Sequence, residues 1–217
     1  MKTNKLGTFF IIGGLAAFPI AANAMDCTPS FNFSTVKEGV ISVALTNTPP
    51  YSFEKNGEIS GIDGELIKKF AANNCLAVEY EIYTYPAAVS SVQSKRADVG
   101  LGGFYRTAAR ERVVSLSDPV YLDQLAVISE QGFSTVDQLI GKSVGTVEGY
   151  DWVMEMEDIF SESQTYPSSL NLAQDLQAGR IDAALEGFGA AVSLNGDSGM
   201  SIELLQPDPR ITATVDA

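Results

Sequence analysis

The chain has 217 residues, a formal net charge of -13 and no histidine. Histidine is the commonest general base and the commonest metal ligand, so a hydrolase triad and a zinc site are disfavoured, and we expect no metal and no cofactor. The lysines and arginines are dispersed in an acidic chain, which disfavours nucleic acid and anionic membrane as partners.

The first residues follow the order of a secretory signal. Lys2 and Lys5 precede an apolar run from Leu6 to Ile20, and Ala22-Asn23-Ala24 then offers an A-x-A cleavage site. A membrane anchor is the alternative, but the run contains glycine and proline and is shorter than the roughly 20 apolar residues of a spanning helix. We therefore predict that residues 1–24 are a signal peptide and that the mature chain is exported.

Two cysteines, Cys27 and Cys75, remain in the exported chain. Oxidising conditions outside the cytoplasm allow a disulfide to persist, so we expect these cysteines to pair. The alternative is two unrelated buried thiols, because free cysteine often behaves as a small apolar residue.

Strand and helix patterns alternate in the first half of the mature chain. Residues 39–47 form a nearly continuous apolar run, typical of a strand buried on both faces. The predicted elements are that strand, a helix after Ser60 with apolar positions from Ile62 to Ala71, a strand at 77–83, a helix opened by Pro86, and a strand at 97–101. This βαβαβ order predicts a parallel sheet, in which ligands bind beyond the carboxyl ends of the strands.

A second α/β cycle is predicted after Ser117-Asp118-Pro119. Its expected elements are a strand through Val127, a helix at 135–139, a strand at 143–147, a helix from Tyr150, a strand at 164–166, a helix at 170–178 and a strand at 181–185. Two lobes joined near Pro119 fit this pattern better than one continuous sheet, which periodicity alone leaves as the alternative.

A receptor for a carboxylate is indicated at the end of the strand at 97–101. Gly102 and Gly103 let backbone N–H groups approach a ligand, and Thr107 can cap a short helical turn whose N–H groups favour an anion. Arg110 follows one turn later and can form a bidentate pair with a carboxylate. The alternative is a solvated basic turn whose arginines contact only water.

Further motifs occur in a fixed order along the chain. They are Pro-Pro-Tyr-Ser-Phe at 49–53, Gly-Ile-Asp-x-Glu-Leu from Gly61, the set Gly103, Tyr105, Thr107 and Arg110, Ser117-Asp118-Pro119 with Tyr121, Gly-Lys-Ser-Val-Gly at 141–145 and Leu-Gln-Ala-Gly-Arg-Ile-Asp-Ala at 176–183. In this order they resemble the extracellular solute-binding proteins of family 3, the periplasmic binding proteins of polar amino-acid ABC transporters. The resemblance covers almost all of the mature chain.

The resemblance implies an α/β, two-lobed type 2 periplasmic-binding-protein fold of the Venus flytrap kind. Lobe 1 would span residues 25–118, lobe 2 residues 119–206, and residues 207–217 would start a return crossover to lobe 1. Relatives usually add a further strand and helices to lobe 1, so the resemblance implies that the C-terminal part of this lobe is lacking here. If the sequence is a fragment, apolar surface of lobe 1 should be exposed.

The resemblance also assigns ligand-binding roles. Arg110 would clamp the α-carboxylate of the ligand, assisted by Thr107 and the Gly103 backbone, while Tyr105 stands where relatives usually have a small hydroxyl residue. The aromatic residues and their neighbour have these expected places: Tyr85 stacked on the ligand, Tyr51 and Phe53 lining lobe 1, and Tyr150 with Asp151 at the helix start of lobe 2 that closes over the ligand. The alternative for each aromatic residue is a place in the core.

One position departs from the family pattern. Many relatives bind the ligand ammonium through an aspartate just past the strand that ends here at Leu185, but this chain has Gly187 in that place. Glu186 is adjacent and can substitute only if the backbone turns, because neighbouring strand residues point to opposite faces.

The resemblance implies a function in the periplasm. A monomer would capture an amino acid or similar small carboxylate between its lobes, close by hinge motion near Pro119, and present the ligand to the membrane subunits of an ABC importer. Catalysis is not expected. The alternatives are an enzyme that resembles cyclohexadienyl dehydratases, with Glu186 or Asp151 as general acid, and a ligand-sensing module for a separate signalling partner.

Overall fold

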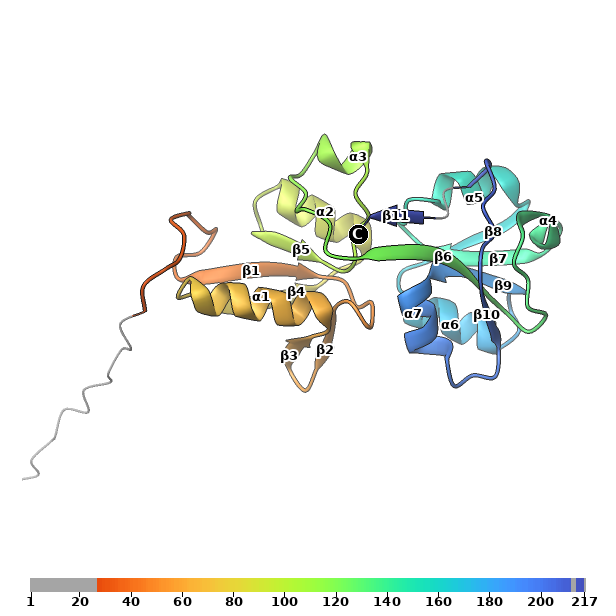
Figure 1. Ribbon diagram of the computed structural model, residues 1–217, viewed down its shortest axis with the longest axis horizontal. Coiled ribbons are helices and arrows are strands. Elements are labelled where there is room, and N and C mark those ends of the chain that lie inside the picture. The colour runs from red at the N-terminus through yellow and green to blue at the C-terminus, as the bar shows by residue number, and fades with distance from the viewer. Residues whose placement is uncertain (1–26, 212–213, 217) are drawn as a thin grey trace, which may run out of the picture.

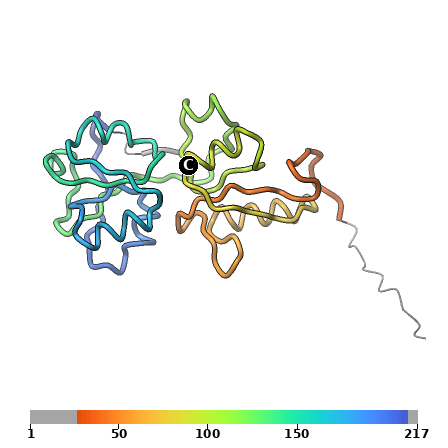
Figure 2. Tube along the Cα trace, turned by 180° about the vertical axis from the view of Figure 1, so that it is seen from behind, coloured from red at the N-terminus to blue at the C-terminus, as the bar shows by residue number. Residues whose placement is uncertain are grey.

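The computed structural model describes residues 27–211 and 214–216, which form two lobes joined end to end (Figure 1). The view from behind shows the same two lobes (Figure 2). The predicted signal peptide, residues 1–24, lies outside the described residues. Within those residues, no helix has both the length and the apolar character needed to cross a membrane.

Lobe 1 is built on a parallel sheet of three strands in the order β4-β1-β5. The bounds are β1 (Val40–Leu45), β4 (Ala77–Ile82) and β5 (Val99–Leu101), with helices α1 (Ile62–Asn73) and α2 (Tyr85–Gln93) in the connections and α3 (Ala108–Glu111) after β5. Central strand β1 is almost wholly buried, as its continuous apolar sequence requires. The predicted βαβαβ order is confirmed, because β1 pairs in parallel with both neighbours.

Helix α1 follows Ser60, as predicted, and its N-cap is Gly61, with no side-chain hydrogen bond. Ser60 itself ends the antiparallel hairpin of β2 (Phe53–Lys55) and β3 (Glu58–Ser60). Gly61 has φ 94°, and a Cβ there would lie 2.4 Å from the carbonyl oxygen of Tyr51. Tight packing against the preceding loop therefore selects glycine over a capping hydroxyl.

Lobe 2 has a mixed sheet in the order β10-β6-β9-β7-β8, so its cycle is not a copy of the first. The strands are β6 (Leu122–Ser129), β7 (Ser143–Val147), β8 (Glu162–Tyr166), β9 (Ala183–Gly187) and β10 (Ser201–Leu204), and the helices are α4 (Val136–Leu139), α5 (Val153–Ile159), α6 (Ser169–Gln177) and α7 (Phe188–Asn195). Strand β6 runs antiparallel to β9 and β10, whereas β7 is parallel to β8 and β9.

Strand β6 also joins the two lobes. It leaves lobe 1 and continues as an inner strand of the lobe 2 sheet (Figure 1). Near its start, β11 (Thr214–Asp216) pairs with it antiparallel, so two chain segments lie side by side there. Along β6, Leu125 and Val127 pack into one core cluster of lobe 2, and Ala126 and Ile128 into the cluster on the other face. Alternate residues of this strand thus serve opposite faces.

A disulfide joins Cys27 to Cys75, with 5.7 Å between the two Cα atoms. Cys75 lies just beyond the C-terminal end of α1, so the bond fixes the first described residues against this helix. The predicted pairing is present.

Replacing both cysteines by alanine should lower the free energy of unfolding. The bond closes a loop with a sequence separation of 48, and the chain-entropy model then gives a loss of at most about 4 kcal/mol. Urea unfolding of the double variant Cys27→Ala/Cys75→Ala, compared with the oxidised parent, measures the loss. Equal stability of the two proteins would contradict a stabilising role for the bond.

Candidate functional site

A small cavity lies where the two lobes meet, and charged and aromatic side chains converge on it. Its lining comes from lobe 1 (Thr48, Tyr51, Tyr85, Gly103, Tyr105 and Arg110), from β6 (Asp123) and from lobe 2 (Tyr150, Asp151, Trp152, Glu186 and Gly187). The cavity holds about 20 Å³, which is room for about one water molecule. A larger ligand can enter only if the lobes separate.

Arg110 spans the boundary between the lobes. Its Nη1 donates a hydrogen bond to the carbonyl oxygen of Tyr105 at 2.6 Å, and its Nη2 donates to that of Gly149, in the loop after β7, at 2.9 Å. The guanidinium carbon lies 5.6 Å from the centre of the Phe104 ring. Burial lowers the pKa of Arg110 from its usual value, but an arginine stays protonated in proteins. The site therefore contains a fixed, partly desolvated positive charge.

Short-range contacts place Arg110 on its turn. Thr107 is the N-cap of α3, and its Oγ1 accepts a hydrogen bond from the backbone N–H of Arg110 at 3.2 Å. This cap was predicted, and it orients the helical turn that carries the guanidinium.

Glu186 supplies a buried carboxyl group from β9. Only 1% of the residue is exposed. Its Oε1 accepts from the Tyr150 hydroxyl at 2.6 Å and from the Gly187 backbone N–H at 3.1 Å, while Oε2 has no hydrogen-bond partner among the described residues. Burial raises the pKa of Glu186 from its usual 4.5 to about 7.

Asp123 supplies a second buried carboxylate, from β6. It is 5% exposed, and its Oδ2 accepts a hydrogen bond from the Tyr105 hydroxyl at 3.0 Å. The Tyr51 hydroxyl also lies near this carboxylate. Burial and the neighbouring Asp123 carboxylate raise the pKa of both tyrosines far above the usual value, so both hydroxyls keep their protons.

Aromatic rings enclose these charges. The Tyr150 ring meets those of Tyr85 and Trp152 edge to face, with centroid distances of 4.9 and 5.0 Å. Tyr85 is buried, its hydroxyl donates to the carbonyl oxygen of Gly102, and its oxygen lies 3.0 Å from Thr48 Oγ1. The Trp152 Nε1 donates to Thr146 Oγ1 at 2.9 Å. These bonds hold the rings of Tyr85 and Trp152 in their positions around the cavity.

Eight of the ten predicted ligand residues line this cavity: Tyr51, Tyr85, Gly103, Tyr105, Arg110, Tyr150, Asp151 and Glu186. Thr107 and Phe53 do not, since Thr107 caps α3 and Phe53 begins the β2-β3 hairpin. The Gly103 N–H, expected to face a ligand, instead donates to Asp63 Oδ2 at 3.0 Å.

Four residues that line the cavity were not among the predicted ligand residues: Thr48, Asp123, Trp152 and Gly187. For Asp123, the sequence pattern contained a clue. Asp123 precedes Leu125 and Val127 at a spacing of two, on the inward face of a strand, where an acidic residue is unusual. For Trp152, the only clue in the sequence was its position next to the predicted residues Tyr150 and Asp151.

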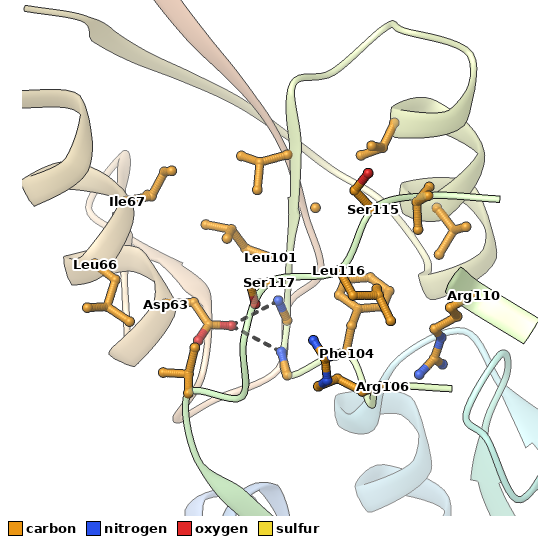
Figure 3. Close-up of a pocket in the computed structure, with 18 of the residues that line it drawn as sticks. Asp63, Leu66, Ile67, Leu101, Phe104, Arg106, Arg110, Ser115, Leu116 and Ser117 are labelled. Atoms are coloured by element: carbon orange, nitrogen blue, oxygen red, sulfur yellow. Dashed lines mark hydrogen bonds between the residues drawn. The ribbon is translucent and has the colours of Figure 1, made fainter. Parts of the chain in front are cut away.

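A second, larger cavity of about 290 Å³ lies on lobe 1. Figure 3 shows Leu66 and Ile67 of α1 at one end and Arg110 at the other. Most of its lining side chains are aliphatic, and Asp63 in its wall already accepts the N–H groups of Gly102 and Gly103 (Figure 3). Its polar lining residues all come from lobe 1 and the segment that leaves it, whereas the cavity between the lobes receives charged groups from both lobes, so the latter is the better candidate site.

No group of three or more histidine, cysteine, aspartate or glutamate side chains in the described part of the chain is arranged to hold a metal. The chemistry of the site is instead a guanidinium, buried carboxyl groups and neutral tyrosine hydroxyls between two lobes. That combination defines a protein that encloses a small polar solute.

The comparisons with known proteins agree with this class. The family model of bacterial extracellular solute-binding proteins, family 3, matches residues 41–166, more than half of the chain. The putative ABC transporter arginine-binding protein 2 of Escherichia coli is 27% identical over 84% of this chain and 73% of that protein. The L-cystine-binding protein TcyJ of the same species is 27% identical over 89% of this chain and 77% of that protein.

Solved structures show the same fold. The arginine-bound form of a truncated ArgBP from T. maritima matches with a TM-score of 0.72 and 22% identity over 82% of this chain and 88% of that one. An ancestral arginine-binding protein bound to glutamine matches with a TM-score of 0.71 and 23% identity over 83% of this chain and 84% of that one. The fold is therefore the two-lobed type 2 periplasmic-binding fold, as predicted. The chain belongs to family 3 of the bacterial extracellular solute-binding proteins.

The raised pKa of Glu186 makes stability depend on pH. A carboxyl group with a higher pKa in the folded than in the unfolded chain stabilises the fold below pH 4.5, and that contribution is lost as pH rises to about 7. The loss should reach about 3 kcal/mol between about pH 5 and pH 8. Urea unfolding across this range should show it in the parent and not in Glu186→Gln. Glu157→Gln, at an exposed position of α5, is the control, and identical pH profiles for Glu186→Gln and the parent would contradict the assignment.

Proposed function

We propose that this protein captures a basic amino acid in the periplasm and presents it to the membrane subunits of an ABC importer. The observation that carries the proposal is the meeting of one guanidinium with buried carboxyl groups in a single cavity between two lobes. A zwitterion offers a partner to each of these groups, and a neutral or purely anionic solute does not.

Arg110 is the proposed clamp on the α-carboxylate of the amino acid. Its planar guanidinium can donate two parallel hydrogen bonds to a carboxylate, which a lysine ammonium cannot. The Nη2 contact to Gly149 comes from lobe 2. A carboxylate inserted at this point would take over that donor when the lobes separate, so ligand and lobe 2 would compete for the same group. Thr107 would assist through the turn that it caps.

The charge balance of the cavity favours a ligand with an extra positive charge. Asp123, Asp151 and Glu186 line it together with only one cationic side chain, Arg110. The α-ammonium and α-carboxylate of an amino acid cancel each other, so two negative charges remain when Glu186 is ionised. A guanidinium or ammonium on the ligand's side chain would balance this excess and pack against the faces of Tyr51, Tyr85 or Trp152.

The printed names of the relatives support the same ligand class. Two Escherichia coli relatives are named arginine-binding proteins of ABC transporters, and another is named a histidine-binding periplasmic protein. The cystine-binding relative shows that sequence similarity at this level does not by itself fix the side chain of the ligand. The charges of the cavity therefore carry the choice of a basic amino acid.

Hinge motion would couple binding to transport. The cavity of about 20 Å³ has no room for an amino acid, so the lobes must open around β6 and β11 before a ligand enters. Closure would then bury the ligand, and the importer would recognise the closed form.

The proposal includes a monomeric protein with the predicted division of the chain. Residues 1–24 would be a signal peptide, residues 25–118 lobe 1 and residues 119–206 lobe 2, with residues 207–217 returning toward lobe 1.

Replacing Arg110 by alanine should weaken the binding of L-arginine by about 3 kcal/mol, roughly a hundredfold, because a charge-assisted pair is lost in a desolvated site. Titration calorimetry of the mature protein measures the loss. Arg112→Ala is the matched control, since Arg112 is exposed at the other side of the same turn. Undiminished affinity in Arg110→Ala would exclude Arg110 as the clamp.

A thermal-shift screen of the common L-amino acids and L-cystine tests the ligand class independently. A ligand that binds only the folded protein raises the melting temperature. L-arginine and L-lysine should give the largest shifts and L-glutamate none. A largest shift with a neutral or acidic amino acid would contradict the choice of a basic ligand and leave solute capture intact.

The enzymatic alternative retains one specific observation in its favour. A buried carboxyl group with a pKa of about 7, Glu186, is what a general acid at neutral pH needs. An acid of this kind can protonate the leaving hydroxyl of prephenate, with loss of water and carbon dioxide and formation of an aromatic acid. Incubation with prephenate, followed by ultraviolet detection of the aromatic product, decides. We expect no turnover, and product formation that Glu186→Gln abolishes would replace capture by catalysis.

A further inference from the structure

The Asp123 carboxylate fills the space that a side chain at position 187 would need. A Cβ built on Gly187 would lie 2.3 Å from Oδ2 of Asp123, far inside van der Waals contact. Gly187 has φ -59° and ψ 139°, which any residue adopts, so the backbone does not require glycine. The missing side chain leaves space that the Asp123 carboxylate fills.

The fold brings the two positions together through adjacent strands. Strands β6 and β9 are antiparallel neighbours, with Leu125 opposite Gly187. Asp123 comes two residues earlier on β6 and therefore points to the same face as Leu125. Its carboxylate therefore lies next to Gly187, the last residue of β9, across the pair of strands.

No ion pair in the described part of the chain neutralises either buried acid. The six ion pairs found there involve neither Asp123 nor Glu186. Asp123 accepts hydrogen bonds from donors that carry no charge: the Tyr105 hydroxyl and the backbone N–H groups of Gln124 and Gly189. Such donors satisfy lone pairs, but they do not remove the charge, whose burial is costly without a cation.

The two oxygens of Asp123 have different surroundings. Oδ1 accepts from the Gly189 N–H at 3.4 Å, in the first turn of α7, and from its own neighbour Gln124 at 3.0 Å. Oδ2 accepts from the Tyr105 hydroxyl and is the atom that approaches Gly187. A purely structural role, capping α7, would use Oδ1 alone. Glu186, the residue before Gly187, lines the same cavity, and its Oε2 is also buried and has no hydrogen-bond partner among the described residues.

We propose that Asp123 binds the α-ammonium of the ligand, together with Glu186, and that it does so from the place that a side chain at position 187 would otherwise fill. This inference rests on the proposed capture of a basic amino acid and names the residue that selects for its amino group. Positions 123 and 187 are then alternative sources of one carboxylate.

The test compares two ligands that differ only in the α-amino group. L-arginine and 5-guanidinopentanoic acid, which is arginine without that group, are titrated calorimetrically into the mature protein and into Asp123→Asn. The asparagine keeps the size of the side chain and its acceptor oxygen. Loss of a charge-assisted contact should weaken L-arginine binding about 10- to 100-fold and 5-guanidinopentanoic acid binding less than about 3-fold. The preference for L-arginine should therefore collapse.

A structural role would give a different result. If Asp123 only caps α7 and positions tyrosines, Asp123→Asn should weaken both ligands by the same factor, and that outcome would overturn the inference. Failure of the parent protein to bind L-arginine at all would instead refute the proposed function, and the inference with it. Circular dichroism and the melting temperature of each variant show whether it folds.

A relocated carboxylate gives a second measurement, which also serves if Asp123→Asn does not fold. Asp123→Ala frees the space next to position 187, and Asp123→Ala/Gly187→Asp returns a carboxylate to it. The double variant should regain most of the preference for L-arginine that Asp123→Ala loses. Gly187→Asp alone should bind L-arginine weakly, because its side chain meets Asp123. A double variant no better than Asp123→Ala would show that the two positions are not interchangeable.

Discussion

The arrangement of the site depends on a positive charge that is held between two lobes and cannot be discharged. Arg110 keeps its proton even where burial lowers its pKa, so the protein has to supply acceptors or admit an anion. It supplies the carbonyl oxygens of Tyr105 and Gly149, one from each lobe. Because one of these acceptors is on lobe 2, the strength of contact between the lobes depends on what the guanidinium binds.

The opposite side of the cavity has the complementary requirement. Asp123 and Glu186 are both nearly unexposed, and like charges held close together raise the free energy of the folded chain. Tyrosine hydroxyls lessen this cost by donating hydrogen bonds, and the pKa of Glu186 rises so that it can take a proton instead. A ligand cation would remove the need for that proton, so binding would be linked to proton release near neutral pH.

Much of the fold could be predicted from periodicity and turn residues. The apolar run of β1 and the helical spacing of α1 have local causes, and the parallel order of lobe 1 follows from them. Helix α7 could not be predicted in this way, because its sequence Phe-Gly-Ala-Ala-Val-Ser-Leu-Asn has small or apolar residues on all sides and shows no polar face. The antiparallel entry of β6 was also missed, since strand direction depends on where the chain crosses between lobes.

In the site, too, residues whose positions depend on local sequence were predictable, and residues whose positions depend on strand pairing were not. Arg110 and its cap Thr107 were predictable because a single short turn, residues 107–110, determines their geometry. Predicting Asp123 would require knowing that β6 lies beside β9 with Leu125 opposite Gly187, and no single segment of the sequence shows this pairing. In the sequence, Gly187 stands where many relatives have an acid, and the adjacent Glu186 is the only substitute that the local pattern suggests. The nearest substitute in space lies 64 residues earlier (187 − 123) on a neighbouring strand, close enough that the two side chains exclude each other.

The tyrosines of this cavity keep their protons. Burial raises the pKa of Tyr85 to about 12 and those of Tyr51, Tyr105 and Tyr150 further, so all four remain neutral hydrogen-bond donors. They can hold carboxylates in position but cannot change the charge of the cavity. Only the carboxyl groups can, and Glu186 is the one whose pKa lies near neutrality. The pH response of the empty protein therefore arises from Glu186, which is also one of the two acids that we propose to bind the ammonium of the ligand.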